Sequence, residues 1–399
     1  MDTGKPMTRR EFLKASATTV AVSAVGDRLL GQQAASQPAT RSIETPEPVY
    51  LKSWELVEYP SLPGKNKQLM KLTASNGAFG VSRAIGKCTD LAAAEKVIQG
   101  ADLLQHEKLF DLMVAKSVPQ AQRGTVDIAC WDLHARMLKK PLHALLGTKK
   151  TKILRYGDVR GSQPDFSPQK YAGSVAKYFE RSGLQATKLH FPGALGTKEG
   201  IPFKDVLETL KEVRKAVGKE KVLAWDPYPG SAESAANSVD EAKEILKLMD
   251  ELGYTWIEGP LPPVPFEQQI PKYVELMKAG SKQRIQAEGP GSPIGDGTSF
   301  EVMKQWVEVG AVSQCSTDVY IVGGLTVVYR ILEYARTNPD RKLTINLHWD
   351  WAPHAHLAMA YDEKVLPIQE FPYGSEVPPS CLDGAYLLAP DWPGIYCIK

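Results

Sequence analysis

Three acidic residues with regular spacing are the chemically most informative feature of this 399-residue sequence. Asp226, Glu258 and Glu288 stand 32 and 30 residues apart, and each closes an apolar run that is typical of a short buried strand. Strands of a parallel αβ barrel end on one face, so carboxylates at successive strand ends would converge there. Converging carboxylates repel one another unless a cation lies between them, and oxygen ligands suit Mg²⁺. The spacing therefore predicts a Mg²⁺ site in a metal-assisted enzyme.

Two basic residues close the strand that precedes these acids in the predicted barrel. Lys188 and His190 stand two residues apart, so their side chains point to the same face of a strand and could both reach the barrel mouth. Beside a cation or another basic group, the pKa of Lys188 is expected to be lowered. A lone histidine is more often a structural hydrogen-bonding group, and that role is assigned to His106, His134 and His143.

The elements that must position these residues form two patterns. Segments 49–58 and 67–74 are typical of a strand pair, and segments 92–113 and 123–138 of two helices, which together predict an α+β unit. From residue 152 onward, short apolar runs alternate with amphipathic helical patterns. Eight strands are expected near Ile153, Thr187, Val222, Trp256, Ile285, Val312, Thr344 and Pro367.

This alternation predicts an α/β fold, a closed (β/α)7β TIM-like barrel, because seven helical patterns follow the strands and no clear eighth helix follows the last one. A Gly-rich phosphate fingerprint is missing after the first strand, which argues against a dinucleotide-binding sheet. We predict an α+β capping domain over residues 41–150, a catalytic barrel over 151–372, and a C-terminal segment, 373–399, that returns to the capping domain.

The first forty residues resemble an export signal. Arg9-Arg10 is followed by Phe12, Lys14 and an apolar stretch from 15 to 25, the layout of a twin-arginine signal. Eleven residues are too short for a membrane span of about twenty, so we expect cleavage between 23 and 39 and no stable membrane anchor. Residues 1–40 are therefore assigned to signal peptide and linker, and the mature protein to the periplasm or the extracellular space.

Composition limits the partners. The chain has 48 basic and 46 acidic residues and a net charge of +2, without the basic stripe that nucleic-acid binding requires. Small molecules are the expected partners, and a homo-oligomer is the expected assembly. Five cysteines lack paired spacing, which leaves disulfides undecided, although Cys130 and Cys315 stand in apolar runs and are expected to be buried.

Several motifs resemble the enolase superfamily, specifically its mandelate racemase and muconate lactonizing enzyme branch. The carriers of this resemblance are the segments 123–137 (RGTVDIACWDLHARM) and 141–147 (PLHALLG), the three acids, Gly323-Gly324 and the closing Asp383-Gly384 with Pro393-Gly394. The resemblance covers residues 48 to 399. It implies that Asp226, Glu258 and Glu288 are the Mg²⁺ ligands, and that the reaction removes the proton next to a carboxylate to give an enediolate.

The same resemblance implies roles for five further residues. Many members carry Lys-x-Lys where this chain has Lys188 and His190, and the departure leaves the identity of the general base open. Asp318 and His348 stand where the mandelate racemase group has an Asp–His dyad, in which the carboxylate orients the imidazole. Glu370 matches a residue that hydrogen-bonds the substrate carboxylate.

Three functions remain open from the sequence. The first choice is dehydration of a sugar acid to a 2-keto-3-deoxy acid, with His348 protonating the departing hydroxide. A racemase or epimerase is the alternative, because bases on both faces could exchange protons. A non-catalytic exported ligand-binding protein on the same scaffold is the third. Specificity is expected in the loops 59–67 and 80–89, with Tyr228, Trp349 and Trp351 as candidate pocket walls.

Overall fold

The computed structural model describes residues 43–62, 67–85, 88, 90–161, 166–194, 200–227, 235–261, 266–287, 297, 299–373 and 376–398. The twin-arginine segment, Glu288 and Tyr228 lie outside the described residues. Residues 41–399 form one compact unit, so the predicted boundaries within it stay an interpretation. Within the described parts, no helix combines the length and the apolar composition needed to cross a membrane.

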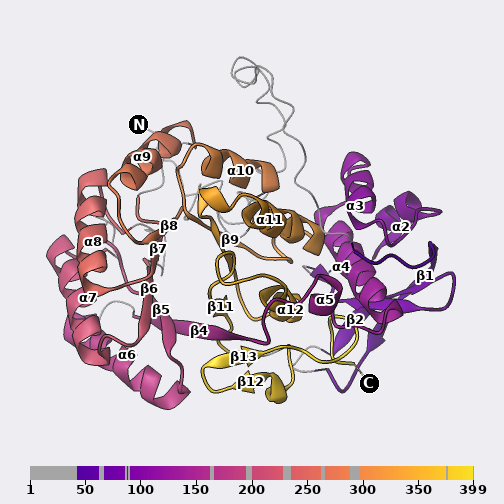
Figure 1. Ribbon diagram of the computed structural model, residues 1–399, viewed down its shortest axis with the longest axis horizontal. Coiled ribbons are helices and arrows are strands. Elements are labelled where there is room, and N and C mark those ends of the chain that lie inside the picture. Colours follow the sequence, from indigo (N-terminus) through magenta and orange to yellow (C-terminus); the bar gives the residue numbers. More distant parts are fainter. Residues whose placement is uncertain are drawn as a thin grey trace, which may run out of the picture. The chain divides into compact units, whose positions relative to one another are not determined.

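The first part of this unit is a three-stranded antiparallel sheet packed against helices (Figure 1). Its elements are β1 (Leu51–Glu58), β2 (Gln68–Ala74), β3 (Phe79–Ser82), α2 (Ala92–Ile98), α3 (His106–Ala115), α4 (Gln120–Met137) and the short α5 (Leu142–Leu145). The predicted strand pair and the second helix are confirmed.

The predicted single helix over 92–113 is wrong, because the chain turns between α2 and α3. Gly100 has a φ of +76°, a backbone conformation that glycine adopts readily and that ends a helix. The Asp102 carboxylate then accepts the N–H groups of Leu104 and Val49, at 3.1 and 3.3 Å. The bond to Leu104 is local and the bond to Val49 spans 53 residues, and both favour a turn over a continuous helix.

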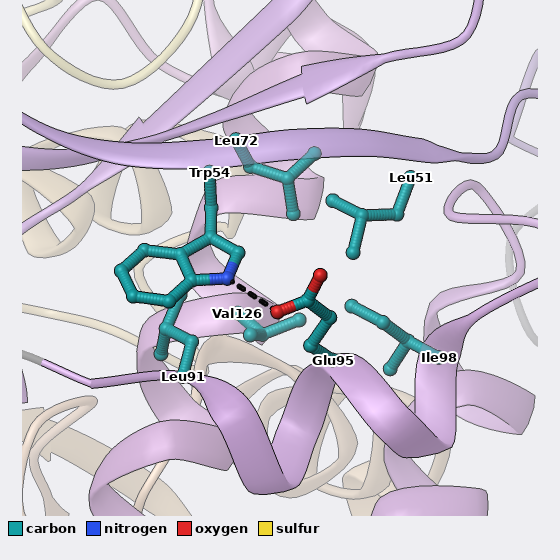
Figure 2. Close-up of a pocket in the computed structure, with 7 residues that line it drawn as sticks. All are labelled: Leu51, Trp54, Leu72, Leu91, Glu95, Ile98 and Val126. Atoms are coloured by element: carbon teal, nitrogen blue, oxygen red, sulfur yellow. Dashed lines mark hydrogen bonds between the residues drawn. The ribbon is translucent and has the colours of Figure 1, made fainter.

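A small apolar pocket lies between this sheet and its helices (Figure 2). Trp54 and Glu95 face each other there, and the Trp54 indole N–H donates to Glu95 Oε2 at 2.8 Å. The remaining lining residues are Leu51, Leu72, Leu91, Ile98 and Val126. The pocket is therefore part of the packing between α2, α4 and the sheet, and its carboxylate already has a donor.

The second part alternates strands and helices. Its parallel strands are β4 (Lys152–Arg160), β5 (Ala186–His190), β6 (Val222–Asp226), β7 (Trp256–Glu258), β8 (Arg284–Gln286), β9 (Gln314–Thr317), β10 (Thr344–Leu347) and β11 (Gln369–Glu370). The helices that follow the first seven are α6 (Pro168–Ser182), α7 (Phe203–Val217), α8 (Val239–Leu252), α9 (Phe266–Lys278), α10 (Phe300–Glu308), α11 (Leu325–Thr337) and α12 (Ala352–Ala360). Figure 1 shows α6 to α9 on the outer side of β5 to β8.

Strand pairing follows the order of a barrel. Parallel ladders join β4 through β8, β11 pairs with β4, and β9 pairs with β10. Hydrogen bonds outside these ladders link the two remaining junctions: among them, Ser313 N–H donates to Ile285 O, and Ile345 N–H to Val365 O. The chain is thus a (β/α)7β TIM-like barrel with an N-terminal α+β capping region, as the alternation of the sequence predicts.

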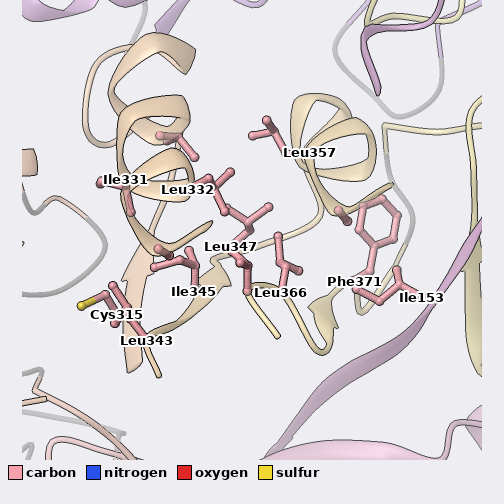
Figure 3. Close-up of a cluster of buried hydrophobic side chains, with 14 of the residues drawn as sticks. Ile153, Cys315, Ile331, Leu332, Leu343, Ile345, Leu347, Leu357, Leu366 and Phe371 are labelled. Atoms are coloured by element: carbon pink, nitrogen blue, oxygen red, sulfur yellow. The ribbon is translucent and has the colours of Figure 1, made fainter. Parts of the chain in front are cut away.

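Helix ends and core packing follow from local sequence. Ser167, Ser238 and Ser299 cap the N-termini of α6, α8 and α10 through their hydroxyl groups, and Gly183 and Gly253 close α6 and α8 in the left-handed conformation. Figure 3 shows the buried layer beneath α11 and α12, where Cys315 packs among aliphatic side chains. Cys130 is also buried, so the expectation for both thiols is confirmed.

The C-terminal segment contacts both parts. Its elements are the 3-10 turn η4 (Pro379–Cys381), β12 (Leu382–Asp383) and β13 (Tyr386–Leu388). Another 3-10 turn, η3 (Pro339–Arg341), lies earlier in the chain, directly after α11. β13 pairs antiparallel with the start of β4. Asp132 of α4 accepts the N–H groups of Val81 and Ile395, and Arg136 donates to the carbonyl of Tyr396.

Candidate active site

The barrel interior is built in two layers that differ by two residues along each strand. The lower layer, with side chains 6% exposed or less, consists of Tyr156, Ala186, Ala224, Trp256 and Ile368. Two positions later on the same strands stand Asp158, Lys188, Asp226, Glu258 and Glu370. Side chains two apart on a strand share a face, so an apolar floor supports a charged layer at the carboxyl ends of the strands, where barrel enzymes place their active sites.

Lys188 is the centre of this charged layer. Its Nζ lies 3.2 Å from Glu258 Oε2, 3.5 Å from Glu370 Oε2 and 3.9 Å from Asp226 Oδ2. The second oxygen of Glu258 accepts the indole N–H of Trp256 at 2.9 Å. Three carboxylates, one each from β6, β7 and β11, are thus brought together around the ammonium group of β5.

The electrostatics of Lys188 differ from the expectation. Burial lowers the pKa of its ammonium, but the charges of Glu258 and Glu370 outweigh burial and raise the pKa well above its usual value. The predicted lowering requires a cation beside Lys188. Among carboxylates alone the shift has the opposite sign, because each neighbouring negative charge favours the protonated amine.

His190 lies between two carboxylates. Its Nδ1 is 3.3 Å from Asp226 Oδ2 and its Nε2 is 3.5 Å from Asp158 Oδ1. Burial opposes ionisation of Asp158, but the hydrogen bond from His190 and the charge of Lys188 lower its pKa to about 2. His190 therefore belongs to the charged layer, as predicted, and Asp158 joins it.

Sequence reasoning missed Asp158, Tyr156 and Asn346. The Tyr156 hydroxyl lies 3.0 Å from Glu370 Oε2 and 2.9 Å from Asn346 Oδ1, and thereby links β4, β10 and β11 beneath the charged layer. The sequence does contain a signal for Asp158: it stands two residues after Tyr156, just as Lys188 stands two residues after Ala186. Asp158 lies within a nine-residue strand, whereas Asp226 and Glu258 stand at the last position of their strands.

Asp318 and His348 form a hydrogen-bonded pair at the ends of β9 and β10. His348 Nδ1 lies 3.1 Å from Asp318 Oδ2. Asp318 is 1% exposed, whereas the His348 side chain is 30% exposed. Burial opposes the charge of Asp318, yet the hydrogen bond from His348 and the charge of His354 hold its pKa below the usual value. The imidazole is thus oriented by a buried carboxylate and is itself partly exposed.

The pair lies opposite Lys188. In a ring of eight strands, β5 and β9 are separated by four positions and occupy opposite sides of the barrel. Proton-transfer groups on both sides of a central space could act on the two faces of one carbon. Glu370 on β11 lies between these sides: burial raises its pKa, and the charges of Lys188 and His348 on the two sides oppose that shift.

The donor set at Asp226 and Glu258 fits a divalent cation. Both side chains offer carboxylate oxygens as ligands. With Asp158 and Glu370, the charged layer holds four acidic side chains against the two basic ones of Lys188 and His190. Burial raises the pKa of Asp226 to about 6, and the charge of Glu258 adds to this effect. The layer thus lacks positive charge, which a dication would supply. The third predicted ligand, Glu288, lies outside the described residues, two positions after buried Gln286.

The other predicted residues divide into two groups. Trp351 donates to Asp318, and the ring of Trp349 lies with its centroid 6.0 Å from that of His348, so both tryptophans lie near the site. The remaining histidines are buried and bonded to the fold: His106 to His134, His143 to the carbonyl of Pro390, His354 to the N–H of Val319 and the carbonyl of Trp349, and His356 to the carbonyl of Ile395. The structural role assigned to His106, His134 and His143 matches these contacts.

Comparison with known proteins supports the family. The model of the enolase C-terminal domain-like family matches residues 170–395, more than half of the chain. The arabinonate dehydratase of Saccharolobus solfataricus is 26% identical over 277 residues, which cover 65% of this chain and 66% of that protein, just under two thirds of its length.

Two solved structures have the same fold. A mandelate racemase/muconate lactonizing enzyme from Polaromonas sp. is 19% identical with a TM-score of 0.63, and the match covers 88% of this chain and 95% of that one. A racemase from Streptomyces coelicolor, solved with bound magnesium, is 18% identical with a TM-score of 0.61, and the match covers 88% and 97%. From the family match and the barrel that it shares with these enzymes, the chain belongs to the enolase superfamily, in its mandelate racemase and muconate lactonizing enzyme branch.

Proposed function

We propose that this chain is a Mg²⁺-dependent enzyme that removes the proton next to the carboxylate of a small acid, and that it dehydrates a sugar acid to a 2-keto-3-deoxy acid. The observation that carries the proposal is the pairing of two opposite groups in one barrel mouth. Lys188 stands among buried carboxylates on one side, and the Asp318–His348 pair stands on the other.

The metal site of the proposal consists of Asp226, Glu258 and Glu288. Bound Mg²⁺ would supply the positive charge that stabilises the substrate carboxylate as its neighbouring carbon loses a proton. That charge is needed because a positioned base contributes only about 10²- to 10⁴-fold, whereas enzymes accelerate reactions by at least about 10⁶-fold.

On the β5 side, Lys188 and His190 are the candidates for the base. Lys188 carries a firmly bound proton among its carboxylates, which suits it to hold an anionic substrate until a cation lowers its pKa. His190 has a carboxylate beside each ring nitrogen, and Asp158 would orient it. Burial raises the pKa of Glu370, despite the charge of Lys188, and this favours the protonated form that can donate to a substrate carboxylate.

On the opposite side, His348 would protonate the departing hydroxide. A hydroxide is a poor leaving group, so its departure needs a proton donor at the leaving oxygen. Asp318 orients the imidazole and stabilises its protonated form. Dehydration is preferred because the relative at 26% identity is an arabinonate dehydratase. A racemase is the second candidate, because bases on both faces would also exchange a proton with either face.

The test uses purified protein with Mg²⁺ in D₂O and a panel of pentonic, hexonic and aldaric acids, beginning with arabinonate. NMR would follow the loss of water and the entry of deuterium at the carbon next to the carboxylate. We expect a 2-keto-3-deoxy acid from at least one acid, and none from His348→Asn. Unchanged Mg²⁺ affinity in His348→Asn would serve as the control for folding.

The other outcomes favour the alternatives. Recovery of the starting acid as a deuterated stereoisomer would replace the dehydratase assignment with a racemase or epimerase. An acid that binds to the Mg²⁺-loaded protein but exchanges no proton would favour the non-catalytic binding protein instead.

A further inference from the structure

Asp318 accepts more than the imidazole of His348. Its Oδ2 also accepts the indole N–H of Trp351 at 2.8 Å, a shorter contact than the 3.1 Å to His348 Nδ1. Its Oδ1 accepts the backbone N–H groups of Tyr320 and Ile321, at 2.7 and 3.3 Å. One carboxylate oxygen is therefore shared between a tryptophan and the candidate proton donor.

Trp351 is fixed on two sides. Its ring meets that of Tyr320 edge to face, with centroids 4.9 Å apart and an interplanar angle of 84°. Its backbone stands at the N-cap of α12, and the next N–H, of Ala352, donates to Glu376 Oε2 at 2.9 Å. A tryptophan held in this way keeps its indole N–H in one direction.

Both supports of Trp351 lead to Arg83, in the segment after β3. Arg83 forms a buried ion pair with Glu376. Its backbone N–H donates to the Tyr396 hydroxyl at 3.3 Å, and that hydroxyl contacts the Tyr320 hydroxyl at 2.7 Å. Arg83 thus connects the loop in which specificity is predicted with both supports of Trp351.

We propose that Trp351 is a positioning residue of the Asp318–His348 pair, and that Arg83, Glu376, Tyr320 and Tyr396 fix its direction. This inference rests on the proposed role of the pair. The indole N–H neutralises part of the charge on Asp318 Oδ2 and sets the side from which His348 can approach the same oxygen.

Loss of the indole N–H should shift the protonation of His348 in one direction. The negative charge on Asp318 Oδ2 would act more strongly on His348, which would favour the protonated imidazole. Glu370 also faces His348, and its charge stays the same in this comparison. The imidazole would in addition gain freedom to tilt, because its acceptor would have one partner fewer.

The test compares Trp351→Phe with Trp392→Phe. Phe keeps most of the ring packing and removes the donor, and Trp392 is a matched control because its indole N–H donates to a backbone carbonyl, that of Ile395, at 3.1 Å. The first readout is the NMR titration of the His348 imidazole in the substrate-free protein. We expect its midpoint to move to higher pH by about half a unit or more in Trp351→Phe, and to stay unchanged in Trp392→Phe.

The second readout is turnover. In Trp351→Phe, kcat should fall by about tenfold with little change in KM, because substrate binding is retained and the proton donor is misplaced. The pH limb that reports His348 should move in the same direction as the NMR midpoint. An unshifted midpoint, or an equal shift in Trp392→Phe, would overturn the inference.

Two further measurements keep the inference testable. If Trp351→Phe does not fold, Tyr396→Phe removes the links to Tyr320 and Arg83, and it should shift the His348 midpoint in the same direction by a smaller amount. In the wild type, the chemical shift of the Trp351 indole N–H should change as His348 titrates. A shift that stays constant would refute the inference that the two groups share one oxygen of Asp318. Because both NMR readouts need no turnover, they separate a failure of this inference from a failure of the proposed function.

Discussion

At Lys188, one ammonium faces three carboxylates, and this arrangement explains both its firm protonation and the need for more positive charge. Asp226 responds to the same imbalance, because burial and the charge of Glu258 raise its pKa to about 6. A dication beside Asp226 and Glu258 would reverse both effects, since it favours the ionised acid and disfavours the protonated amine.

The first prediction at the residue scale concerns Mg²⁺ binding. Glu258→Gln removes one negative ligand and should weaken Mg²⁺ binding by at least about tenfold. Mutation of residues that only hydrogen-bond to the ligands commonly weakens metal binding by that much. Isothermal titration calorimetry would measure the affinity. Glu301→Gln on the surface of α10 is the control. Equal affinity in wild type and Glu258→Gln would place the metal elsewhere.

The sequence allowed the prediction of Asp226 and Glu258 from their spacing and their places at strand ends, and of Lys188 from its place two residues before His190 on one strand. From the family resemblance, the sequence also predicted Asp318, His348 and Glu370. It could not reveal Asp158, which lies inside a long strand, or the bond from Trp351 to Asp318. Both depend on how strands and helix ends meet in space, and neither leaves a local pattern.

At the scale of elements, α4 explains why the motif of segment 123–137 contains two buried acids. Asp127 accepts the N–H and the hydroxyl of Thr326 at the start of α11. Asp132 accepts from Val81 of β3 and from Ile395 of the C-terminal segment. The motif therefore joins the capping region, a barrel helix and the C-terminal segment.

The junction at the start of α12 gives a prediction on stability. Burial raises the pKa of Glu376 to about 7, although Arg83 opposes this shift. A raised folded-state pKa means that the contribution of Glu376 to stability is fully present below its ordinary value of 4.5 and is lost as the pH rises to about 7. The loss would be at most about 3 kcal/mol.

Glu376→Gln keeps an acceptor for Ala352 N–H but does not titrate. The change in unfolding free energy between pH 4.5 and 7.5 should therefore be smaller in this variant than in the wild type, as measured by urea unfolding at each pH. The surface substitution Glu301→Gln should show the same change in unfolding free energy between the two pH values as the wild type. Identical pH dependence in wild type and Glu376→Gln would contradict the assigned titration.

Element prediction succeeded where periodicity is strong, missed the short strands β3, β12 and β13, and extended one helix across a turn. The apolar runs of the barrel strands and the serine caps of α6, α8 and α10 are local signals. The break between α2 and α3 depends on Asp102, whose carboxylate binds Val49 more than fifty residues away. That contact stabilises the turn from a distance, so helical periodicity alone extends the helix too far.

At the scale of the whole molecule, we propose export by the twin-arginine route, on the basis of the first forty residues. This route carries folded proteins, so the metal site could be loaded before export. Replacing Arg9 and Arg10 by Lys should retain the precursor in the cytoplasm, as measured by cell fractionation. Arg28→Lys is the matched control, and export of the double variant at the wild-type level would refute the signal.

The pairing of β13 with β4 also sets a timescale for synthesis. The end of β4 and residue 398 are separated by 238 residues, which a ribosome adds in about 10 to 50 seconds. During that interval the first half of β4 and the Asp132 carboxylate of α4 await their C-terminal partners. The nascent chain therefore carries an open strand edge that chaperones can occupy, and the native barrel is completed only after residues 386–395 have left the ribosome.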